Sequence, residues 1–331
     1  PIFYYKNGEK LPKYYEYYPN GSLKISNEME IYYEEDTKIS NGTYIEYDNK
    51  GKVIKKEQYK NNELTGEYIG EDKQAYSGFI VANYLDGELN GTYTRFYEDG
   101  KKRVETKYLK DKLEGEYREY YENGKLKLIS NYKDNQLNGK YLSYYEDGEI
   151  ESSCYYKDNR LNGEYIKYYN NGKVKEKSLF KNGNLDGELV EYYDNGNIKA
   201  KTKTIDGKLN GELSYYYENG KLKETRVYKD NLLNGENVLY YKNGKISKKQ
   251  NYVNGVLHGT YVFYYESGKL WGKGNYASGK LNGQILKYYE NGKVQLDANY
   301  SKGNRHGEYK EYYENGQLLV SVTYFNGEII K

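Results

Sequence analysis

A glycine recurs at a fixed interval of 24 residues through most of the sequence. After Gly91 it returns at Gly115, Gly139, Gly163, Gly187, Gly211, Gly235, Gly259, Gly283 and Gly307, and each of these glycines opens a new copy of one pattern. A fixed period of this size is typical of repeat proteins, in which each unit buries its apolar groups against its neighbours and not around one central core. The sequence therefore predicts a repeat array.

Each copy also contains a second glycine, nine residues after the first, as Gly124 follows Gly115. It usually follows Asn or Asp and lies between two runs that are rich in tyrosine and aliphatic residues. This pattern is typical of a β-hairpin with a two-residue type I′ turn, because both central residues of that turn need positive φ. With Asn123 and Gly124 as the turn, Tyr132 should lie across from Gly115, where the absence of a Cβ leaves room for the ring.

The same turn predicts which residues share a face of the sheet. Tyr120 should lie opposite Lys127, and Tyr121 opposite Leu126. Because side chains alternate along a strand, one face, called the packing face below, should hold Tyr117, Tyr121, Leu126 and Tyr132. A leucine two residues before the opening glycine repeats in support of this face, at Leu137, Leu161, Leu185, Leu209, Leu233, Leu257 and Leu281.

The fold class that follows is all-β, an elongated repeat array of antiparallel β-hairpins that forms a twisted single-layer ribbon. Residues 42–331 are expected to form one continuous repeat domain, and residues 1–41 an atypical N-terminal cap, in which Pro12 and Pro19 restrict pairing to an edge. Between Gly66 and Gly91 the spacing is 25, so one residue is inserted near 72–77, as a bulge or a longer turn.

The charge pattern argues against several kinds of partner. The chain has 51 Lys and Arg residues against 49 Asp and Glu, interleaved within every copy, so no basic field exists to attract nucleic acid, and lipid is disfavoured for the same reason. Oppositely charged residues flank the predicted turns, and we expect them to form solvated cross-strand pairs without a functional role, as in Glu122 with Lys125, Glu218 with Lys221 and Glu290 with Lys293.

The sequence shows no pattern typical of a catalytic or metal site. Cys154 is the only cysteine and is expected to be a buried, inert thiol on the packing face. His258 and His306 both precede an opening glycine and are 48 residues apart, which indicates a position of the repeat and not a metal ligand or a base. No phosphate-binding glycine loop, zinc spacing or nucleophile elbow is present. We therefore expect a protein that is not an enzyme and binds no cofactor.

The segments around the two histidines resemble the MORN repeat. Residues 252–261, YVNGVLHGTY, and residues 303–309, GNRHGEY, are similar to its Y-x-x-G-x-x-x-G core, often with His before the second glycine. The longer form, Gly-Glu-Tyr-x-x-Tyr-Tyr-Glu-Asn-Gly-Lys, is similar to the bacterial variant of that repeat found in YwqK-type antitoxin-labelled proteins. Several copies depart from it with another residue in place of His, at Asn138, Asn162, Asp186 and Asn210. The resemblance implies hairpin repeats over residues 42–331 and a role in protein binding, self-association or lipid contact.

One tyrosine per copy suggests where a partner binds. The row lies on the face away from the leucines and is the candidate partner-binding site, Tyr120, Tyr144, Tyr168, Tyr192, Tyr216, Tyr240, Tyr264, Tyr288 and Tyr312. Tyrosine is favoured at interfaces because it offers rigid amphipathic area. The leading hypothesis is therefore a non-enzymatic scaffold for a protein partner. Rings that only stack on one another to hold the sheet together are the competing explanation.

Two other functions stay open. A bacterial surface or cell-envelope module that binds carbohydrate would use the same aromatic row, and an antitoxin would neutralise a partner toxin. The unpaired strands at the ends of an open sheet also predict self-association. The sequence begins at Pro1, which suggests a processed or truncated product, and both the bacterial cytoplasm and the cell envelope are compatible with it.

Overall fold

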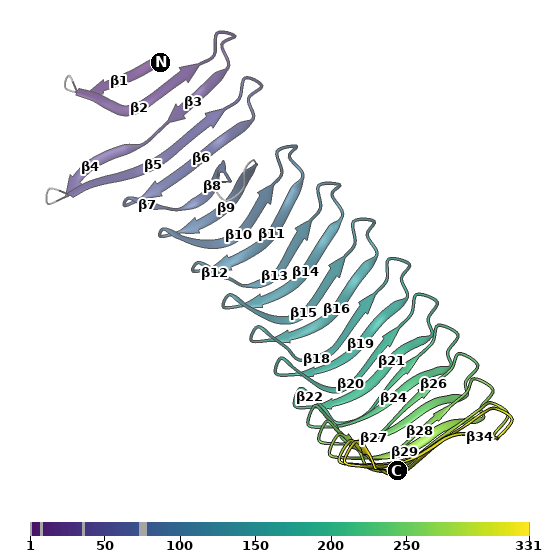
Figure 1. Cartoon of the computed structure of the whole chain (residues 1–331). Helices are drawn as coiled ribbons and strands as arrows, with labels where there is room; N and C mark the ends of the chain where they lie inside the picture. Colours follow the sequence, from purple (N-terminus) through teal and green to yellow (C-terminus); the bar gives the residue numbers. More distant parts are fainter. Residues whose placement is uncertain (1, 7–8, 35–36, 73–77, 331) are drawn as a thin grey trace. The chain divides into compact units, whose positions relative to one another are not determined.

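The computed structural model describes residues 2–6, 9–34, 37–72 and 78–330. These residues form strands and turns and no helix, which confirms the all-β class (Figure 1). Accordingly, the described ranges hold no helix of the length and apolarity needed to cross a membrane. The chain divides into two compact units, Pro1–Leu161 with Asn170–Gly172 and Asn162–Tyr169 with Lys173–Lys331.

The first unit is an open sheet in which hydrogen-bonded neighbours run antiparallel. Short strands such as β12 are followed, after a break of one residue before the opening glycine, by longer ones such as β13, which begins at that glycine. The strands of this unit are β1 (Ile2–Lys6), β2 (Glu9–Tyr17), β3 (Leu23–Asn27), β4 (Glu30–Glu34), β5 (Thr37–Tyr47), β6 (Val53–Lys60), β7 (Glu63–Leu64), β8 (Gly66–Glu71), β9 (Phe79–Leu85), β10 (Glu88–Phe96), β11 (Lys102–Leu109), β12 (Lys112–Leu113), β13 (Gly115–Tyr120), β14 (Leu126–Lys133), β15 (Gln136–Tyr144), β16 (Ile150–Lys157) and β17 (Arg160–Leu161).

The second unit is built in the same way from regular copies, again with antiparallel neighbours. Its strands are β18 (Gly163–Tyr168), β19 (Val174–Lys181), β20 (Asn184–Tyr192), β21 (Ile198–Ile205), β22 (Lys208–Leu209), β23 (Gly211–Tyr216), β24 (Leu222–Lys229), β25 (Leu232–Leu233), β26 (Gly235–Tyr240), β27 (Ile246–Val253), β28 (Val256–Tyr264), β29 (Leu270–Ala277), β30 (Lys280–Leu281), β31 (Gly283–Tyr288), β32 (Val294–Ser301), β33 (Asn304–Tyr312), β34 (Leu318–Phe325) and β35 (Glu328–Ile329).

The loop at the Asn-Gly doublet is longer than the sequence predicts. Between β13 and β14, the Gly124 N–H donates to the Tyr121 carbonyl at 2.8 Å, and the Tyr121 N–H donates to the Lys125 carbonyl at 2.9 Å. Gly124 has a φ of 83°, whereas Asn123 stays in the negative region. This is a three-residue loop, a type I turn followed by a residue with positive φ, and not the predicted two-residue type I′ turn.

The two-residue type I′ turn lies at the other end of the hairpin, between β14 and β15. Asp134 and Asn135 have φ values of 49° and 65°, and Lys133 pairs directly with Gln136. Asn and Asp tolerate this conformation better than other residues with a Cβ, so the turn forms without glycine. Each repeat therefore alternates a three-residue loop with a two-residue turn.

The longer loop changes the predicted register next to it. Tyr120 pairs with Leu126 and Glu119 with Leu128, so the expected pairing of Tyr120 with Lys127 is wrong. Lys127 instead places its Nζ 5.9 Å from the centroid of the Tyr121 ring, on the packing face. Leu126 consequently belongs to the opposite face, beside Tyr120.

Glycine is required at the opening positions for a different physical reason from the one expected. The pairing itself is confirmed, since Gly235 faces Tyr252 as Gly115 faces Tyr132. However, a Cβ at Gly235 would lie 3.0 Å from the Cβ of Val227, and the residue has a φ of 134°. Glycine is required there by its backbone conformation and by a β-branched side chain on the preceding strand, and not by a tyrosine ring.

Tyrosine rings cover a row of small residues on the packing face. The rings of Tyr117 and Tyr132 meet edge to face at a centroid distance of 5.7 Å, and Tyr117 pairs directly with Ser130. A Cβ at Gly274, which occupies the same position of a later repeat, would lie 2.8 Å from the Tyr261 ring. Small residues make room for these rings, and the buried ones at this position are Ala82, Thr106, Ser130, Cys154, Ser178, Thr202 and Ala298.

The N-terminal strands differ from the regular copies. The long strand β5 pairs with β4 through its first half and with β3 through its second, and it runs across the predicted boundary between residues 41 and 42. The role of residues 1–41 as a cap stays a prediction. Of the insertion predicted near 72–77, residues 73–77 lie outside the described residues. Beside them, the Asp72 N–H donates to the Gly78 carbonyl at 3.1 Å.

The lysines beside the loops donate hydrogen bonds to backbone carbonyls. The expected ion pairs with the glutamates of the same turn are therefore wrong. Lys125 Nζ donates to the Asp147 carbonyl at 2.6 Å, Lys221 Nζ to the Asn243 carbonyl at 3.1 Å, and Lys293 Nζ to the Asn315 carbonyl at 2.6 Å. Each acceptor belongs to the loop of the next repeat. These lysines therefore connect successive repeats.

Candidate partner-binding surface

The nine candidate tyrosines end the strands that lead into the three-residue loops. Tyr120 and Tyr144 belong to the first unit, and the other seven to the second. All nine are half-buried. Within a unit, successive members lie two strands apart, which is about 10 Å.

An aliphatic residue lies directly across from each candidate tyrosine. The leucines before the opening glycines still lie across from packing-face tyrosines, as Leu137 does from Tyr132. The three-residue loop instead moves the residues at the Leu126 position, which were expected on the packing face, to the face of the candidate tyrosines. The partners, in order from Tyr120 to Tyr312, are Leu126, Ile150, Val174, Ile198, Leu222, Ile246, Leu270, Val294 and Leu318. Ile150 is 39% exposed and Leu318 is 53% exposed. Within each unit the tyrosines and their partners form a stripe, and these residues are called the tyrosine row below.

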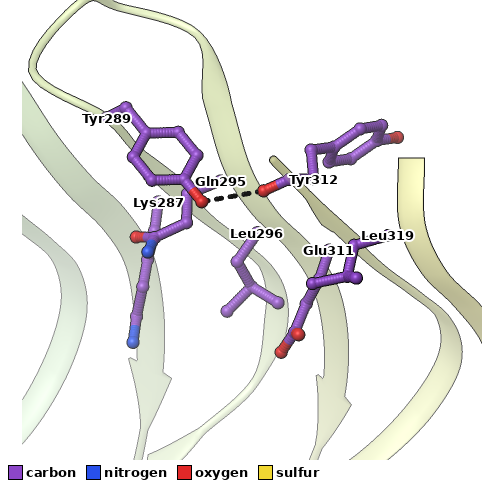
Figure 2. A pocket seen from close by; sticks show the side chains of 7 residues that line it. All are labelled: Lys287, Tyr289, Gln295, Leu296, Glu311, Tyr312 and Leu319. Carbon is purple, nitrogen blue, oxygen red and sulfur yellow. Dashed lines mark hydrogen bonds between the residues drawn. The ribbon is translucent and has the colours of Figure 1, made fainter. Parts of the chain in front are cut away.

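At nine positions that the structure describes, the tyrosine after the aromatic residue that ends a strand joins one repeat to the next. The Tyr289 hydroxyl donates to the Tyr312 carbonyl at 2.9 Å, while the Tyr312 ring lies on the other side of its own backbone (Figure 2). The same bond recurs at 2.6 to 2.9 Å from Tyr18, Tyr97, Tyr121, Tyr169, Tyr193, Tyr217, Tyr241 and Tyr265. Sequence reasoning missed this ladder, although the doubled tyrosine at a constant position was its signal.

The two tyrosines of a pair thus contribute different groups to the fold. The second uses its side-chain hydroxyl, and the first uses its backbone carbonyl as the acceptor. A carbonyl persists when the side chain is changed. The bond between repeats therefore fixes the backbone of the tyrosine row without using the rings of the row.

Tyr120, the first member of the tyrosine row, lies next to charged side chains. The Tyr120 hydroxyl donates to Glu105 Oε2 at 3.2 Å. Burial and, after it, the Glu105 carboxylate raise the pKa of Tyr120. Lys102, whose Nζ lies 2.8 Å from Glu105 Oε1, lowers the pKa of that carboxyl group. This part of the surface combines an aromatic ring with a partly neutralised carboxylate.

A shallow hollow of about 270 Å³ lies where β31, β32, β33 and β34 run side by side (Figure 2). Its lining combines apolar and charged groups, from Lys287, Tyr289, Gln295, Leu296, Glu311, Tyr312 and Leu319. The Tyr312 ring points away from the hollow, and Leu296 lies between the ammonium of Lys287 and the carboxylate of Glu311 (Figure 2). The hollow therefore belongs to the packing face and not to the tyrosine row.

The cysteine and one of the histidines that could serve a catalytic or metal site are instead part of the sheet structure. Cys154 is 2% exposed, and burial raises the pKa of its thiol to about 11, so the nucleophilic thiolate is disfavoured at neutral pH. His306 Nδ1 accepts the backbone N–H of Asn326 at 3.4 Å. In the part of the chain that the structure describes, His, Cys, Asp and Glu side chains do not gather in threes suited to a metal ion.

The residue before the opening glycine has one role in several copies. Asn162 Oδ1 accepts the N–H of Asn182 at 3.2 Å, and Asn210 Oδ1 accepts the N–H of Asp230 at 3.1 Å, as His306 does for Asn326. Each bond satisfies the first N–H of the next two-residue turn. Any side chain with an acceptor can make it, which explains why Asn replaces His in this sequence.

Comparison with known families gives one clear match. The model of the MORN repeat variant matches residues 40–61, 89–110, 113–134, 137–158, 161–182, 185–205, 209–230, 233–254, 257–278, 281–302 and 305–326. These segments follow the 24-residue period, and the copy with 25 residues falls between the first two. Among curated proteins, none is significantly similar in sequence.

Solved structures give distant matches only. The crystal structures of TcdB2-TccC3-TEV and TcdB2-TccC3 are 13% identical to this chain, with TM-scores of 0.16 and 0.14, and the matches cover 98% and 94% of this chain but 23% and 21% of theirs. The Photorhabdus luminescens Tc holotoxin pore with a mutant TccC3 is 13% identical over 92% of this chain and 20% of its own, with a TM-score of 0.15. The chain thus spans less than a quarter of these proteins, and TM-scores this low support no transfer of structure or function.

Proposed function

The chain belongs to the MORN repeat variant family, and from this premise we propose that it is a non-enzymatic scaffold that binds a partner protein through the tyrosine row. One observation supports the proposal above the others. The ladder of second-tyrosine hydroxyls connects the repeats, so the rings of the first tyrosines are not needed for that connection.

The tyrosine row has the properties of a protein interface. Its rings are half-buried beside aliphatic partners, so they offer apolar area with little loss of rotamer freedom on binding. Their backbone is fixed by the neighbouring repeat, which reduces the ordering that a partner must impose. A single-layer sheet repeats this unit, so a partner can contact several copies at once.

The decisive test compares the two tyrosines of the same pairs. One variant carries Ser in place of Tyr192, Tyr216 and Tyr240, and the matched control carries Phe in place of Tyr193, Tyr217 and Tyr241. The serine variant keeps all three acceptor carbonyls and loses the rings, whereas the phenylalanine variant keeps the rings and loses three hydroxyl donors. We expect the serine variant to lose the partner and the phenylalanine variant to lose stability.

The measurement is affinity capture from lysate and envelope fractions of the native cell, followed by mass spectrometry. Circular dichroism of both variants establishes that they are folded at the capture temperature. A protein recovered with the wild type and the phenylalanine variant, but not with the serine variant, would support the proposal. Equal recovery with the serine variant would place the binding site elsewhere.

A further inference from the structure

One stretch of the packing face departs from the repeat pattern in a way that the fold does not require. In each repeat, the residue 4 positions after the opening glycine pairs with the residue 13 positions after it, which in turn pairs with the first such residue of the next repeat. Within a unit these residues form one row of side chains across the strands, called the central row. Around the departure, in the second unit, it runs through Tyr215, Glu224, Leu239, Lys248, Phe263, Gly272, Lys287, Leu296 and Glu311. In the first unit the corresponding row contains Arg95, Val104, Glu119, Leu128, Ser143 and Ser152.

The departure centres on an aromatic pair, the exposed Trp271 and the half-buried Phe263. Trp271 is the only tryptophan of the chain and is 39% exposed. Its ring meets that of Phe263 at a centroid distance of 5.4 Å and that of Tyr265 at 6.5 Å. Lysine occupies the position of Trp271 in four other repeats, at Lys127, Lys175, Lys199 and Lys223. The fold thus accepts a charged residue here, and the exposed indole needs another explanation.

Cations flank the aromatic pair on both sides. Lys248, which pairs with Phe263, places its Nζ 5.5 Å from the centroid of that ring. Lys287 follows on the other side, across the side-chain-free Gly272. Figure 2 shows that the Lys287 side chain points to the same side of the sheet as Leu296.

The carboxylates of the central row nearest to the patch are Glu224 and Glu311, each two strands beyond one of the lysines, and both accept hydrogen bonds. Glu311 accepts from the Tyr309 hydroxyl. Both oxygens of Glu224 accept hydrogen bonds from Arg226, at 2.6 and 2.9 Å, and Oε1 also accepts from Asn237 at 2.8 Å. The exposed Glu266 and Glu290 belong to the three-residue loops and border the patch at the loop edge. The patch around Phe263 and Trp271 therefore presents apolar rings between two lysines, which is complementary to an acidic ligand with an apolar centre.

From this arrangement we infer that Phe263, Trp271, Lys248 and Lys287 form a binding site for an extended acidic peptide segment with one apolar anchor residue. Lys248 and Lys287 lie three strands apart, about 14 Å, which an extended chain spans in about four residues. Side chains two residues apart point to the same face of such a chain. The segment that fits has the pattern acidic-x-apolar-x-acidic, with the anchor on the rings and the carboxylates on the two lysines.

This peptide site is separate from the tyrosine row on which the proposed function depends. Phe263 and Tyr264 are neighbours in β28, so their side chains leave opposite faces of the sheet. Loss of one surface therefore leaves the other in place, and either proposal can fail without the other.

The test uses a random peptide library displayed on phage and selected on the full chain. We expect selection for the acidic-x-apolar-x-acidic pattern on the wild type, and about tenfold or greater loss of affinity for a selected synthetic peptide with Trp271→Lys. The double variant Lys248→Glu with Lys287→Glu should instead select basic residues on both sides of the anchor. The serine variant of Tyr192, Tyr216 and Tyr240 should bind the selected peptide as the wild type does.

The substitutions at Trp271, Lys248 and Lys287 each introduce a residue that is already present at the same position of another repeat, which favours folding. If circular dichroism shows that Trp271→Lys is unfolded, Phe263→Lys replaces it, since Lys167 and Lys287 occupy that position elsewhere. Binding of a selected peptide can be followed on the wild type by the emission of its single tryptophan. Selection of peptides without flanking acidic residues, or equal affinity of Trp271→Lys, would overturn the inference. So would oligosaccharide binding that depends on Trp271 in the absence of any selected peptide.

Discussion

The hydroxyl of Tyr217 donates a 2.8 Å hydrogen bond to the backbone carbonyl of Tyr240 in the next repeat. Tyr216, its neighbour in sequence, contributes only its own carbonyl to this ladder, as the acceptor for Tyr193. Two tyrosines that look equivalent in the sequence thus differ in what the fold needs from them. A single-layer sheet has no second layer to hold its repeats together, so hydrogen bonds of this kind take a larger share of that role.

Replacement of Tyr217 by Phe should destabilise the protein by about 1 kcal/mol, because the half-buried carbonyl of Tyr240 loses its partner. The matched change Tyr216→Phe leaves the ladder intact and should have a clearly smaller effect. Urea denaturation followed by circular dichroism measures both. Equal effects of the two substitutions would show that the ladder does not stabilise the fold.

The two-residue turns offer a way to increase stability. Asn231 accepts the Leu209 N–H on its side-chain oxygen at 2.7 Å, in addition to donating its own N–H to the Leu209 carbonyl. In the preceding repeat Gly207 makes only the second kind of bond, to the Leu185 carbonyl at 2.9 Å, and has a φ of 76° that Asn tolerates.

Substitution Gly207→Asn should therefore stabilise the protein by about 1 kcal/mol, by an added hydrogen bond and a less flexible unfolded chain. The reverse change, Asn231→Gly, should destabilise it by a similar amount. The midpoint of thermal unfolding measures both changes. A lower midpoint for Gly207→Asn would mean that the turn cannot accept a side chain in the geometry of Asn231.

Much of this fold could be predicted from the sequence. The 24-residue glycine period indicates the repeat array, and the Asn-Gly doublet between tyrosine-rich runs indicates the antiparallel hairpins and the pairing of Gly115 with Tyr132. The type of each turn could not be predicted from the sequence. Asn-Gly is the usual signal of a type I′ turn, yet Asn123 and Gly124 form a three-residue loop, while Asp134 and Asn135 form the type I′ turn without glycine.

That difference also explains the error in the candidate surface. The three-residue loop changes only the pairing next to it, so Leu126 and not Lys127 lies across from Tyr120. An irregularity at Lys127 restores the predicted register from Glu119 and Leu128 onward. The Trp271 site was missed for another reason. Its parts come from four strands, and only the register of the sheet brings Lys248 and Lys287 to the two sides of Phe263.

Two opening glycines should differ in their tolerance of alanine. Both Gly211 and Gly235 have positive φ, at 98° and 134°, so a Cβ is strained at each by about 1 kcal/mol or more. At Gly235 the new Cβ would also lie 3.0 Å from Val227, whereas at Gly211 no atom lies within 4 Å. Gly235→Ala should therefore destabilise the protein more than Gly211→Ala, by about 1 to 3 kcal/mol.

Urea denaturation of the two alanine variants gives this comparison. A double variant with Gly235→Ala and Val227→Ala serves as the control, because the smaller side chain removes the Cγ contacts at 3.2 and 3.5 Å but keeps the Cβ of residue 227 and the strained φ. It should recover part of the difference. Equal destabilisation by the two single substitutions would leave φ as the only reason for these glycines.

Alkaline pH should unfold the protein through its covered tyrosines. Burial raises the pKa of Tyr93, Tyr117, Tyr261 and Tyr309 to about 12, whereas a tyrosine in the unfolded chain titrates near pH 10. Between these values the unfolded chain has lost protons that the folded chain keeps, so the free energy of unfolding falls as pH rises. The contribution of these rings is fully present below about pH 10 and is lost progressively as pH rises through about 12.

Tyrosinate absorbance and far-ultraviolet circular dichroism, recorded on the same samples, test this linkage. The exposed tyrosines should ionise first while the sheet stays intact, and the covered ones should ionise together with the loss of ellipticity. The change Tyr117→Phe removes one titrating group but keeps its ring over Ser130, so it should move the unfolding transition to higher pH. Complete ionisation of all tyrosines with an intact sheet would show that the covered rings reach water without unfolding, and the packing face would then be more open than the tyrosine contacts indicate.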